Sequence, residues 1–321
     1  MFLDARRVLF EGLVDYAGLF PPASLAMDDA IAGYRNARSS PEAWIAGRFI
    51  CPASRLAELA ASLIPTMENG EAPWPLAVIL DGDVASAAAT TQVFAAEMGS
   101  AVQIVFTEVP LPSEFALTSG HPDIVPYIDA ACSISPTVVP FFEIPRTESW
   151  QTTLDIVVPA IANETTDRHR TLGAKLRTGG ATAAAFPSLG EVADFVIACA
   201  THGVPFKATA GLHHPYRHKW ADLGVERHGF INLLAAAALA DHGATRETIV
   251  AALSRSQDHQ FHIGVAGMTV GDTTFDIPAL QRIRTALFPS YGSCSFEEPT
   301  EDLRSLGLLP RPLVLLPKER P

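Results

Sequence analysis

The chain has 321 residues, of which 48% are hydrophobic and 18% are charged, and its formal net charge is −12. This length suits one α/β barrel or two ordinary domains, and the apolar fraction is sufficient for a large core. The negative charge disfavours non-specific binding to nucleic acid or to anionic membrane surfaces.

Neither a membrane span nor a disulfide framework is expected. Eighteen apolar residues never run together, and the N-terminus lacks an apolar stretch that ends in a small-residue cleavage site. The four cysteines are scattered without a C-x-x-C pair: Cys51, Cys132, Cys199 and Cys294. We therefore expect reduced thiols in a cytoplasmic protein.

Short apolar runs alternate with longer segments of helical period, which is the pattern of βα units. The expected strands are Gly12–Tyr16, Arg48–Cys51, Leu76–Leu80, Val102–Thr107, Val138–Glu143, Gly173–Leu176, Pro205–Lys207 and Ser290–Ser295. The expected helices between them are Ala26–Arg38, Ser54–Ile64, Val84–Met98, Thr147–Ile161, Leu189–His202 and Ile277–Leu287. Eight strands in this order favour an α/β fold of the closed (β/α)8 type, the TIM barrel, over an open sheet.

The stretch between the seventh and eighth strands is longer than one connection needs. It holds a histidine-rich loop, two helices near Phe230–Asp241 and Arg246–Ser254, and a glycine-punctuated segment. We expect residues 1–309 to form one barrel, with residues 212–276 inserted over the active face and residues 310–321 as a tail. Because Ile231–Leu239 is almost wholly apolar, it must be buried, either within the barrel or in an oligomer contact.

Two lysines in apolar strand segments are the main candidates for chemistry. Lys175 lies in Gly173-Ala174-Lys175-Leu176, and Lys207 lies in Phe206-Lys207-Ala208. Because alternate residues of a barrel strand point inward, both side chains can project into the barrel mouth. A desolvated ammonium, or one beside another cation, loses proton affinity and can form a Schiff base with a carbonyl compound. Anchoring of a phosphate or carboxylate, or a structural ion pair, is the alternative role.

Short glycine turns follow both lysines and offer a site for an anion. Thr178-Gly179-Gly180 and Thr209-Ala210-Gly211 leave backbone N–H groups free to face an anionic group. Arg177 can hold a carboxylate or a phosphate with two hydrogen bonds. At the end of the eighth strand, Ser293 and Ser295 add hydroxyls to the same ring of polar groups.

These motifs resemble those of deoxyribose-phosphate aldolases, class I aldolases on a (β/α)8 barrel. The sixth strand of that family carries Lys-x-x-Thr-Gly, matched here by Lys175, Thr178 and Gly179, and its lysine forms the Schiff base. The seventh strand carries Lys-Ala-Ser-Gly-Gly, to which Lys207-Ala208-Thr209-Ala210-Gly211 is similar. The resemblance implies that Lys175 is the nucleophile and that Lys207 tunes its pKa.

Weaker similarities occur in the same order along the chain. Asp15 lies on the first strand, Phe49-Ile50-Cys51-Pro52 on the second and Glu143 on the fifth. On the eighth strand, Gly292-Ser293-Cys294-Ser295 is similar to the phosphate-binding Gly-Thr-Ser-Ser of the family.

The fourth strand departs from the family. The family has a proton-relaying aspartate there, whereas this chain offers only Gln103 at the equivalent place. Glu108, or Glu143 from the next strand, is the expected substitute. The chain is also longer than a typical member, so a shared barrel and lysine pair would not guarantee the same substrate.

The histidine-rich loop follows the seventh strand directly, on the expected active face. Because adjacent residues of an extended segment point in opposite directions, at most one of His213 and His214 can enter the pocket. There it would be a general acid or base, or a metal ligand with Glu143 and Asp15; a solvent or hydrogen-bonding role is the alternative. Asp15 can orient a lysine, accept a substrate hydroxyl or form a stabilising ion pair.

The leading hypothesis is a class I aldolase-like lyase, without cofactor or metal, that acts on a small anionic carbonyl compound, phosphorylated or carboxylated. Lys175 would be the nucleophile, Lys207 its electrostatic neighbour, and Glu143 or Asp15 the proton carrier. One alternative is a metal-dependent lyase or hydrolase. The other is a non-catalytic barrel that serves as a binding or assembly module, with its strand-end face plugged by the insertion. A homo-oligomer is compatible with each hypothesis.

Overall fold

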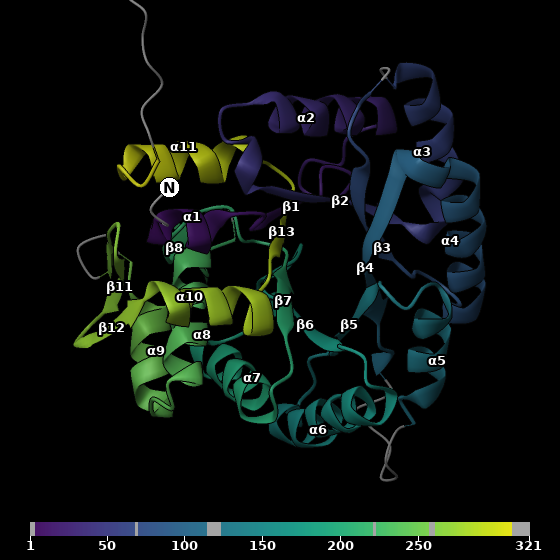
Figure 1. Ribbon diagram of the computed structural model, residues 1–321. Coiled ribbons are helices and arrows are strands. Elements are labelled where there is room, and N and C mark those ends of the chain that lie inside the picture. The colour runs from purple at the N-terminus through teal and green to yellow at the C-terminus, as the bar shows by residue number, and fades with distance from the viewer. Residues whose placement is uncertain (1–3, 68–69, 114–122, 221–222, 257–260, 310–321) are drawn as a thin grey trace, which may run out of the picture.

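The computed structural model describes residues 4–67, 70–113, 123–220, 223–256 and 261–309. Eight parallel strands close into a barrel in the order β1-β13-β7-β6-β5-β4-β3-β2 (Figure 1). Their bounds are β1 Val14–Tyr16, β2 Ala46–Pro52, β3 Trp74–Ile79, β4 Val102–Pro110, β5 Val139–Glu143, β6 Gly173–Arg177, β7 Phe206–Thr209 and β13 Tyr291–Ser293. The predicted (β/α)8 TIM barrel is therefore confirmed. The tail predicted over residues 310–321 lies outside the described residues.

Helices surround the barrel and alternate with its strands (Figure 1). They are α1 Ala5–Phe10, α2 Met27–Ser39, α3 Leu56–Leu63, α4 Val84–Met98, α5 Val125–Ser133, α6 Trp150–Arg168, α7 Leu189–His202, α10 Ile277–Arg282 and α11 Glu297–Ser305. The bounds of α4 and α7 are those predicted. In contrast, α1 and α5 were not among the expected helices, and α6 runs seven residues beyond Ile161 because its last turns are polar and carry no apolar period.

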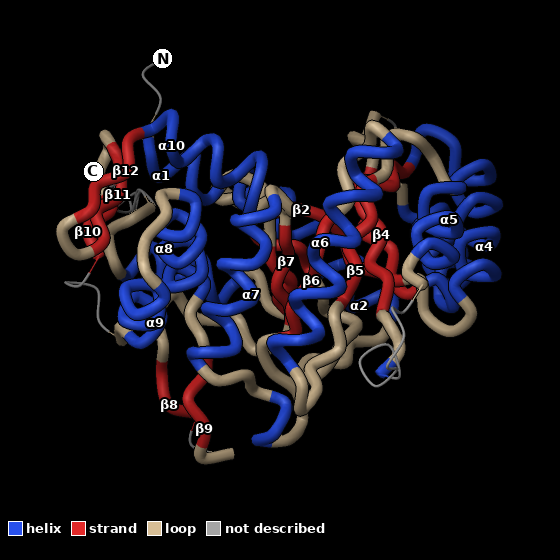
Figure 2. Tube along the Cα trace, turned by 90° about the horizontal axis from the view of Figure 1, so that it is seen from below, coloured by secondary structure: helices blue, strands red, loops and turns tan. Residues whose placement is uncertain are grey.

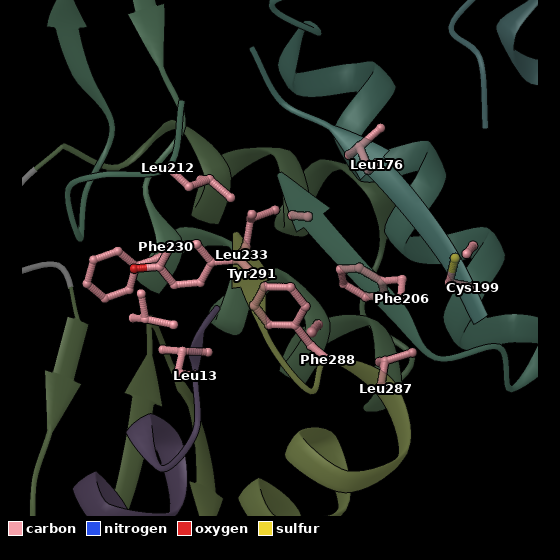
Figure 3. Packing of buried hydrophobic residues seen from close by; sticks show 14 of the residues in the cluster. Leu13, Leu176, Cys199, Phe206, Leu212, Phe230, Leu233, Leu287, Phe288 and Tyr291 are labelled. Atoms are coloured by element: carbon pink, nitrogen blue, oxygen red, sulfur yellow. The ribbon is translucent and has the colours of Figure 1, made fainter. Parts of the chain in front are cut away.

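The core has two parts, one on each side of the sheet. The larger part fills the space between the strands and the helices, and Figure 3 shows it where β7, β13 and α8 (Phe230–Asp241) meet. There Phe206 stacks on Phe288 with ring centroids 4.9 Å apart, and Phe230 stacks on Tyr291 at 5.3 Å. The smaller part lies inside the barrel and consists of Ala17, Ile50, Ala77, Phe106 and Phe141. Apolar side chains therefore pack inside the barrel around its charged groups, and the Lys207 ammonium lies over the Phe106 ring.

One segment, Ala183–His202, is long and apolar enough to cross a membrane by length and composition alone. In the fold it includes α7, whose apolar side is buried against neighbouring elements. Phe195 of this helix stacks on Trp150 of α6 and meets Phe206 of β7 edge to face. This segment therefore contributes a core helix of the barrel wall.

The chain between β7 and β13 forms several small elements. A hairpin of β8 (His218–Trp220) and β9 (Val225–Arg227) comes first, followed by α8 and α9 (Arg246–Ser254), and then by a sheet of β10 (Phe261–Ile263), β11 (Gly267–Val270) and β12 (Thr273–Asp276). Figure 2 shows the hairpin and the three-stranded sheet at opposite ends of the molecule, with α8 and α9 between them. Only part of this stretch therefore lies over one face of the barrel, contrary to the expectation for residues 212–276 as a whole.

Helix α8 belongs to the wall of the barrel. It packs against α7 and α9, and every residue from Phe230 to Leu239 is buried within the chain. The proposed use of Ile231–Leu239 as an oligomer contact is therefore wrong, since its apolar surface is already covered.

Candidate active site

The two lysines and three carboxylates form a continuous chain of ion pairs in the barrel mouth. Lys175 Nζ lies 2.6 Å from Glu108 Oε2 and 2.8 Å from Glu143 Oε2. Lys207 Nζ lies 2.7 Å from Glu108 Oε1 and 2.6 Å from Asp15 Oδ2. Glu108 thus bridges both ammonium groups with its two oxygens.

Strand register brings these groups to one level of the barrel. Lys175 is the register partner of Glu143 on β5 and of Lys207 on β7. Because side chains alternate along a strand, partners in register point to the same side of the sheet. This explains why both lysines point inward, as predicted from their position in apolar strands.

Further contacts fix Asp15 beneath Lys207. Its Oδ1 accepts hydrogen bonds from the backbone N–H of Arg48 at 2.8 Å and from Arg48 Nη1 at 3.2 Å, and its Oδ2 accepts one from Ser290 Oγ at 2.6 Å. Asp15 is fully buried. With four donors around it, this carboxylate has no capacity left for a substrate hydroxyl, so its role here is to hold Lys207.

The charges at the site reinforce one another. Burial alone would raise the pKa of Glu108, but Lys175 and Lys207 outweigh burial and lower the pKa to about 2. In the same way, burial would lower the pKa of Lys175, but Glu108 and Glu143 raise it above its ordinary value. The expectation that the lysine pair loses proton affinity is therefore wrong for Lys175, because a carboxylate lies between the two amines.

Glu108 is the main site residue that the predicted strand bounds left out. The fourth strand was expected to end at Thr107, but β4 continues to Pro110 and pairs with both neighbours along that stretch. Gln103, the residue at the place of the family aspartate, is exposed instead. Phe106 lies inside the barrel, so alternation from Phe106 to Glu108 gives the inward direction, whereas Ile104 belongs to the outer core because the register of β4 shifts between these two residues.

A cavity of about 640 Å³ opens above this charged floor. Lys175, Glu108 and Glu143 line it, whereas the fully buried Lys207 and Asp15 lie below it. Most of the other lining residues are apolar, among them Phe20, Ile50, Ile79, Phe186 and Trp220. The strand-end face is therefore open down to Lys175 and is not plugged, although the cavity does not reach Lys207. A non-catalytic barrel was expected to have a plugged face and no pocket that reaches both lysines.

The glycine turns border the cavity, and an aromatic ring explains why some of these positions are glycine. Gly180, Thr209, Gly211 and Gly292 line the cavity. A Cβ on Gly179 would lie 2.8 Å from Phe186 Cε1, and one on Gly211 would lie 3.3 Å from the same atom. Phe186 therefore rests on both turns and forms a wall of the cavity, with the Trp220 ring 6.3 Å away.

Several predicted anion-binding side chains are already used within the fold. The Thr178 hydroxyl donates to the backbone carbonyls of Thr209 and Ala210, at 3.0 and 2.6 Å. Ser295 Oγ accepts from the backbone N–H of Glu298 in the first turn of α11. Ser293 is buried on β13, and in the described part of the chain neither serine lines the cavity. Arg177 lies at the rim, where it donates to Glu143 at 3.2 Å.

His213 and His214 point in opposite directions, as expected. His213 lines the cavity, and its Nδ1 lies 2.8 Å from Glu298 Oε2. His214 lines a separate surface depression, and its Nδ1 lies 2.6 Å from Asp302 Oδ2. Both partners belong to α11, so this helix holds the loop after β7 in place.

The metal-site hypothesis lacks its ligand set in this geometry. Glu143 pairs with Lys175, Asp15 pairs with Lys207, and His213 pairs with Glu298 instead of either carboxylate. Within residues 4–309, leaving aside the undescribed gaps, no three His, Cys, Asp or Glu side chains are grouped so that they could hold a metal ion.

Comparison with known proteins adds no family assignment. No protein-family model and no curated protein matches this chain.

Proposed function

We propose that the protein is a cytoplasmic enzyme of the class I aldolase type, a lyase that forms a Schiff base with a small anionic carbonyl compound. The observation that carries this proposal is Lys175, a lysine on a barrel strand whose amine lies at the floor of a largely apolar cavity between two carboxylates. Active sites of TIM barrels lie at this end of the strands.

Glu143 is placed to carry the protons that a Schiff base at Lys175 needs, although the ion pairs raise the pKa of Lys175 and lower that of Glu143 and so oppose the first transfer. The ammonium first loses a proton to Glu143, whose side chain is 17% exposed and borders the cavity. The free amine then adds to the substrate carbonyl carbon, and the carbonyl oxygen leaves as water after it takes up two protons, one from the attacking nitrogen and one returned by Glu143. The product is an iminium cation on Lys175, with the same positive charge as the ammonium it replaces.

Glu108 has a different role in this proposal, because its side chain is only 2% exposed and it contacts both amines. Its carboxylate keeps a fixed negative charge beside Nζ of Lys175 throughout the reaction. That charge stabilises the iminium, which withdraws electrons when a carbon–carbon bond of the substrate breaks. Lys207 holds Glu108 in place from the other side.

The remaining walls suggest how the rest of the substrate binds. Arg177 and Arg227 border the cavity together with Gly180 and Gly211, so guanidinium groups and backbone amides lie close to a phosphate or carboxylate bound there. Phe186 and Trp220 offer apolar surface to the carbon skeleton. We therefore place the carbonyl carbon at Lys175 and the anionic group near the rim.

Borohydride trapping tests the proposal. The full-length protein is incubated with acetaldehyde, pyruvate or glyceraldehyde 3-phosphate and reduced, and the modified peptide is identified by mass spectrometry. We expect an adduct on Lys175, formed more readily with the two anionic compounds than with acetaldehyde. Lys175→Met should abolish the adduct, whereas Lys219→Met, which removes an exposed lysine of the β8–β9 hairpin, should not. Equal labelling of Lys219 and Lys175, or no adduct with any of the three, would contradict the proposal.

A further inference from the structure

A second group of reactive side chains lies on another wall of the same cavity. His213 Nε2 is 3.8 Å from Cys294 Sγ, and His213 Nδ1 is 2.8 Å from Glu298 Oε2. The three residues come from the loop after β7, the segment after β13 and the start of α11. Cys294 and His213 both line the cavity. The order is therefore that of a catalytic triad: the thiol is the nucleophile, the imidazole is the base that activates it, and the carboxylate orients the imidazole.

The Glu298 carboxylate determines which nitrogen of His213 carries the proton, and so whether the nitrogen that faces the thiol can accept one. A carboxylate accepts hydrogen bonds, so its contact with Nδ1 favours the tautomer that carries its proton there. The lone pair of Nε2 is then directed toward Cys294 Sγ. Glu298 is itself positioned, because its backbone N–H donates to Ser295 Oγ at 3.1 Å.

A second contact to α11 fixes the imidazole further. His214, the next residue, pairs with Asp302, which lies one helical turn beyond Glu298. Two adjacent histidines thus bind one helix at two successive turns, one on the cavity side and one on the outer side. His213 is buried, so its ring has little freedom to turn away from Cys294.

The surroundings keep both partners uncharged at rest. Burial lowers the pKa of His213, which Glu298 only partly offsets, and Arg227 and His214 lower it further. Burial also raises the pKa of the Cys294 thiol, while the backbone N–H of Ala23 acts in the opposite direction. A neutral thiol beside a neutral imidazole transfers its proton when an electrophile arrives, which is general-base catalysis.

We propose that Cys294 is a second nucleophile of the cavity, for an aldehyde or another activated carbonyl carbon, and that His213, oriented by Glu298, is its base. The sulfur forms a bond to the carbonyl carbon, and the π electron pair of the carbonyl moves to its oxygen. The thiol proton passes to His213 Nε2 and from there to that oxygen, which gives a hemithioacetal without any further reactant. This inference does not depend on Schiff-base formation at Lys175.

Alkylation by iodoacetamide tests the thiol directly, because the sulfur displaces iodide and gives up its proton in the same way. Cys132 is the internal comparison: it is likewise only partly exposed, and burial raises its pKa too. The charged groups that act on it are Arg168, Arg170, Asp129 and Glu164, and His169 lines the same surface depression. Rates at both thiols are measured at pH 7.5 by peptide mass spectrometry on the full-length protein. We expect Cys294 to react about tenfold faster than Cys132, or more.

Two variants separate base catalysis from simple access. His213→Gln should slow alkylation of Cys294 by about tenfold or more and leave Cys132 unchanged. His202→Gln removes an exposed histidine at the end of α7, which does not line the cavity, and should leave both rates unchanged. A Cys294 rate no higher than that of Cys132, or one that His213→Gln leaves equal or increases, would overturn the proposal.

An aldehyde experiment keeps the proposal testable if His213→Gln does not fold. In the Lys175→Met protein, where no Schiff base can form at that position, propionaldehyde should slow alkylation of Cys294 and leave Cys132 unaffected. Unchanged alkylation of Cys294 at a saturating aldehyde concentration would count against the hemithioacetal.

Discussion

At the scale of single residues, Glu108 decides the electrostatics of the barrel mouth. Two ammonium groups lie inside the barrel, and each would be unstable there without a compensating charge. Glu108 contacts both, so one buried carboxylate serves two cations. Glu143 and Asp15 complete the compensation from the outer sides. From the sequence alone, Lys175 and Lys207 were expected to be two adjacent cations. In the fold, the Glu108 carboxylate lies between them.

Substitution of Glu108 should destabilise the protein strongly. Glu108→Gln removes the negative charge shared by Lys175 and Lys207 and leaves two buried ammonium groups with one carboxylate each. We expect a loss of about 3–5 kcal/mol in the free energy of unfolding, measured by urea titration. Glu97→Gln, an exposed change on α4, is the control and should alter stability by less than about 0.5 kcal/mol. A similar small effect for both variants would show that Glu108 does not hold the lysines.

At the scale of elements, one polar residue ties the wall helices to the hairpin. Asn232 is fully buried in the otherwise apolar α8. Its Oδ1 accepts from the backbone N–H of Arg217 at 2.9 Å, and its Nδ2 donates to the carbonyls of Ala252 and Arg255 at 2.8 and 2.9 Å. The segment before β8 and the end of α9 are therefore both fastened to α8.

Replacement of this residue by leucine tests that connection. Asn232→Leu keeps a similar volume but leaves one backbone N–H and two carbonyls without their partner, so we expect a loss of about 2–4 kcal/mol. Asn163→Leu, on the exposed side of α6, should change the free energy of unfolding by less than about 0.5 kcal/mol. Equal midpoints in urea for the two variants would contradict the assignment.

At the scale of the whole molecule, the ion-pair chain makes stability depend on pH at both extremes. The pKa of Glu108 falls from an ordinary 4.5 to about 2, so its contribution is present above pH 4.5 and is lost as the pH falls through 2. The pKa of Lys175 is raised above 10.5, so its contribution is present below that value and is lost as the pH rises through the folded-state pKa. Stability should therefore be greatest between these two limits.

The acid side of this dependence can be assigned to one residue. The shift at Glu108 corresponds to roughly 3 kcal/mol, which should disappear between about pH 5 and pH 2. Urea midpoints of the wild type and of Glu108→Gln, measured across that range, should converge as the pH falls, because protonation removes the same charge as the substitution. Parallel curves would contradict the assignment of the shift to Glu108.

Local patterns determined the barrel and the lysines. Apolar runs alternating with helical segments depend on neighbouring residues alone, and they predicted eight parallel strands with Lys175 and Lys207 pointing inward. The limits of each element were less certain, since β4 continues past Thr107 where the apolar run stops. That continuation depends on pairing with β3 and β5, which no local pattern contains.

Only the tertiary structure decided which groups meet. Glu108 lies 67 residues before Lys175 and 99 before Lys207, and His213 lies 81 residues before Cys294. Likewise, the Phe186 ring contacts both Gly179 and Gly211 because the turns that follow β6 and β7 lie side by side. The sequence by itself therefore determined the fold class and the lysine strands, because periodicity is local. Contacts among distant residues determined the charge of the site, the shape of the cavity and its second nucleophile, because strand register and the closure of the barrel set those distances.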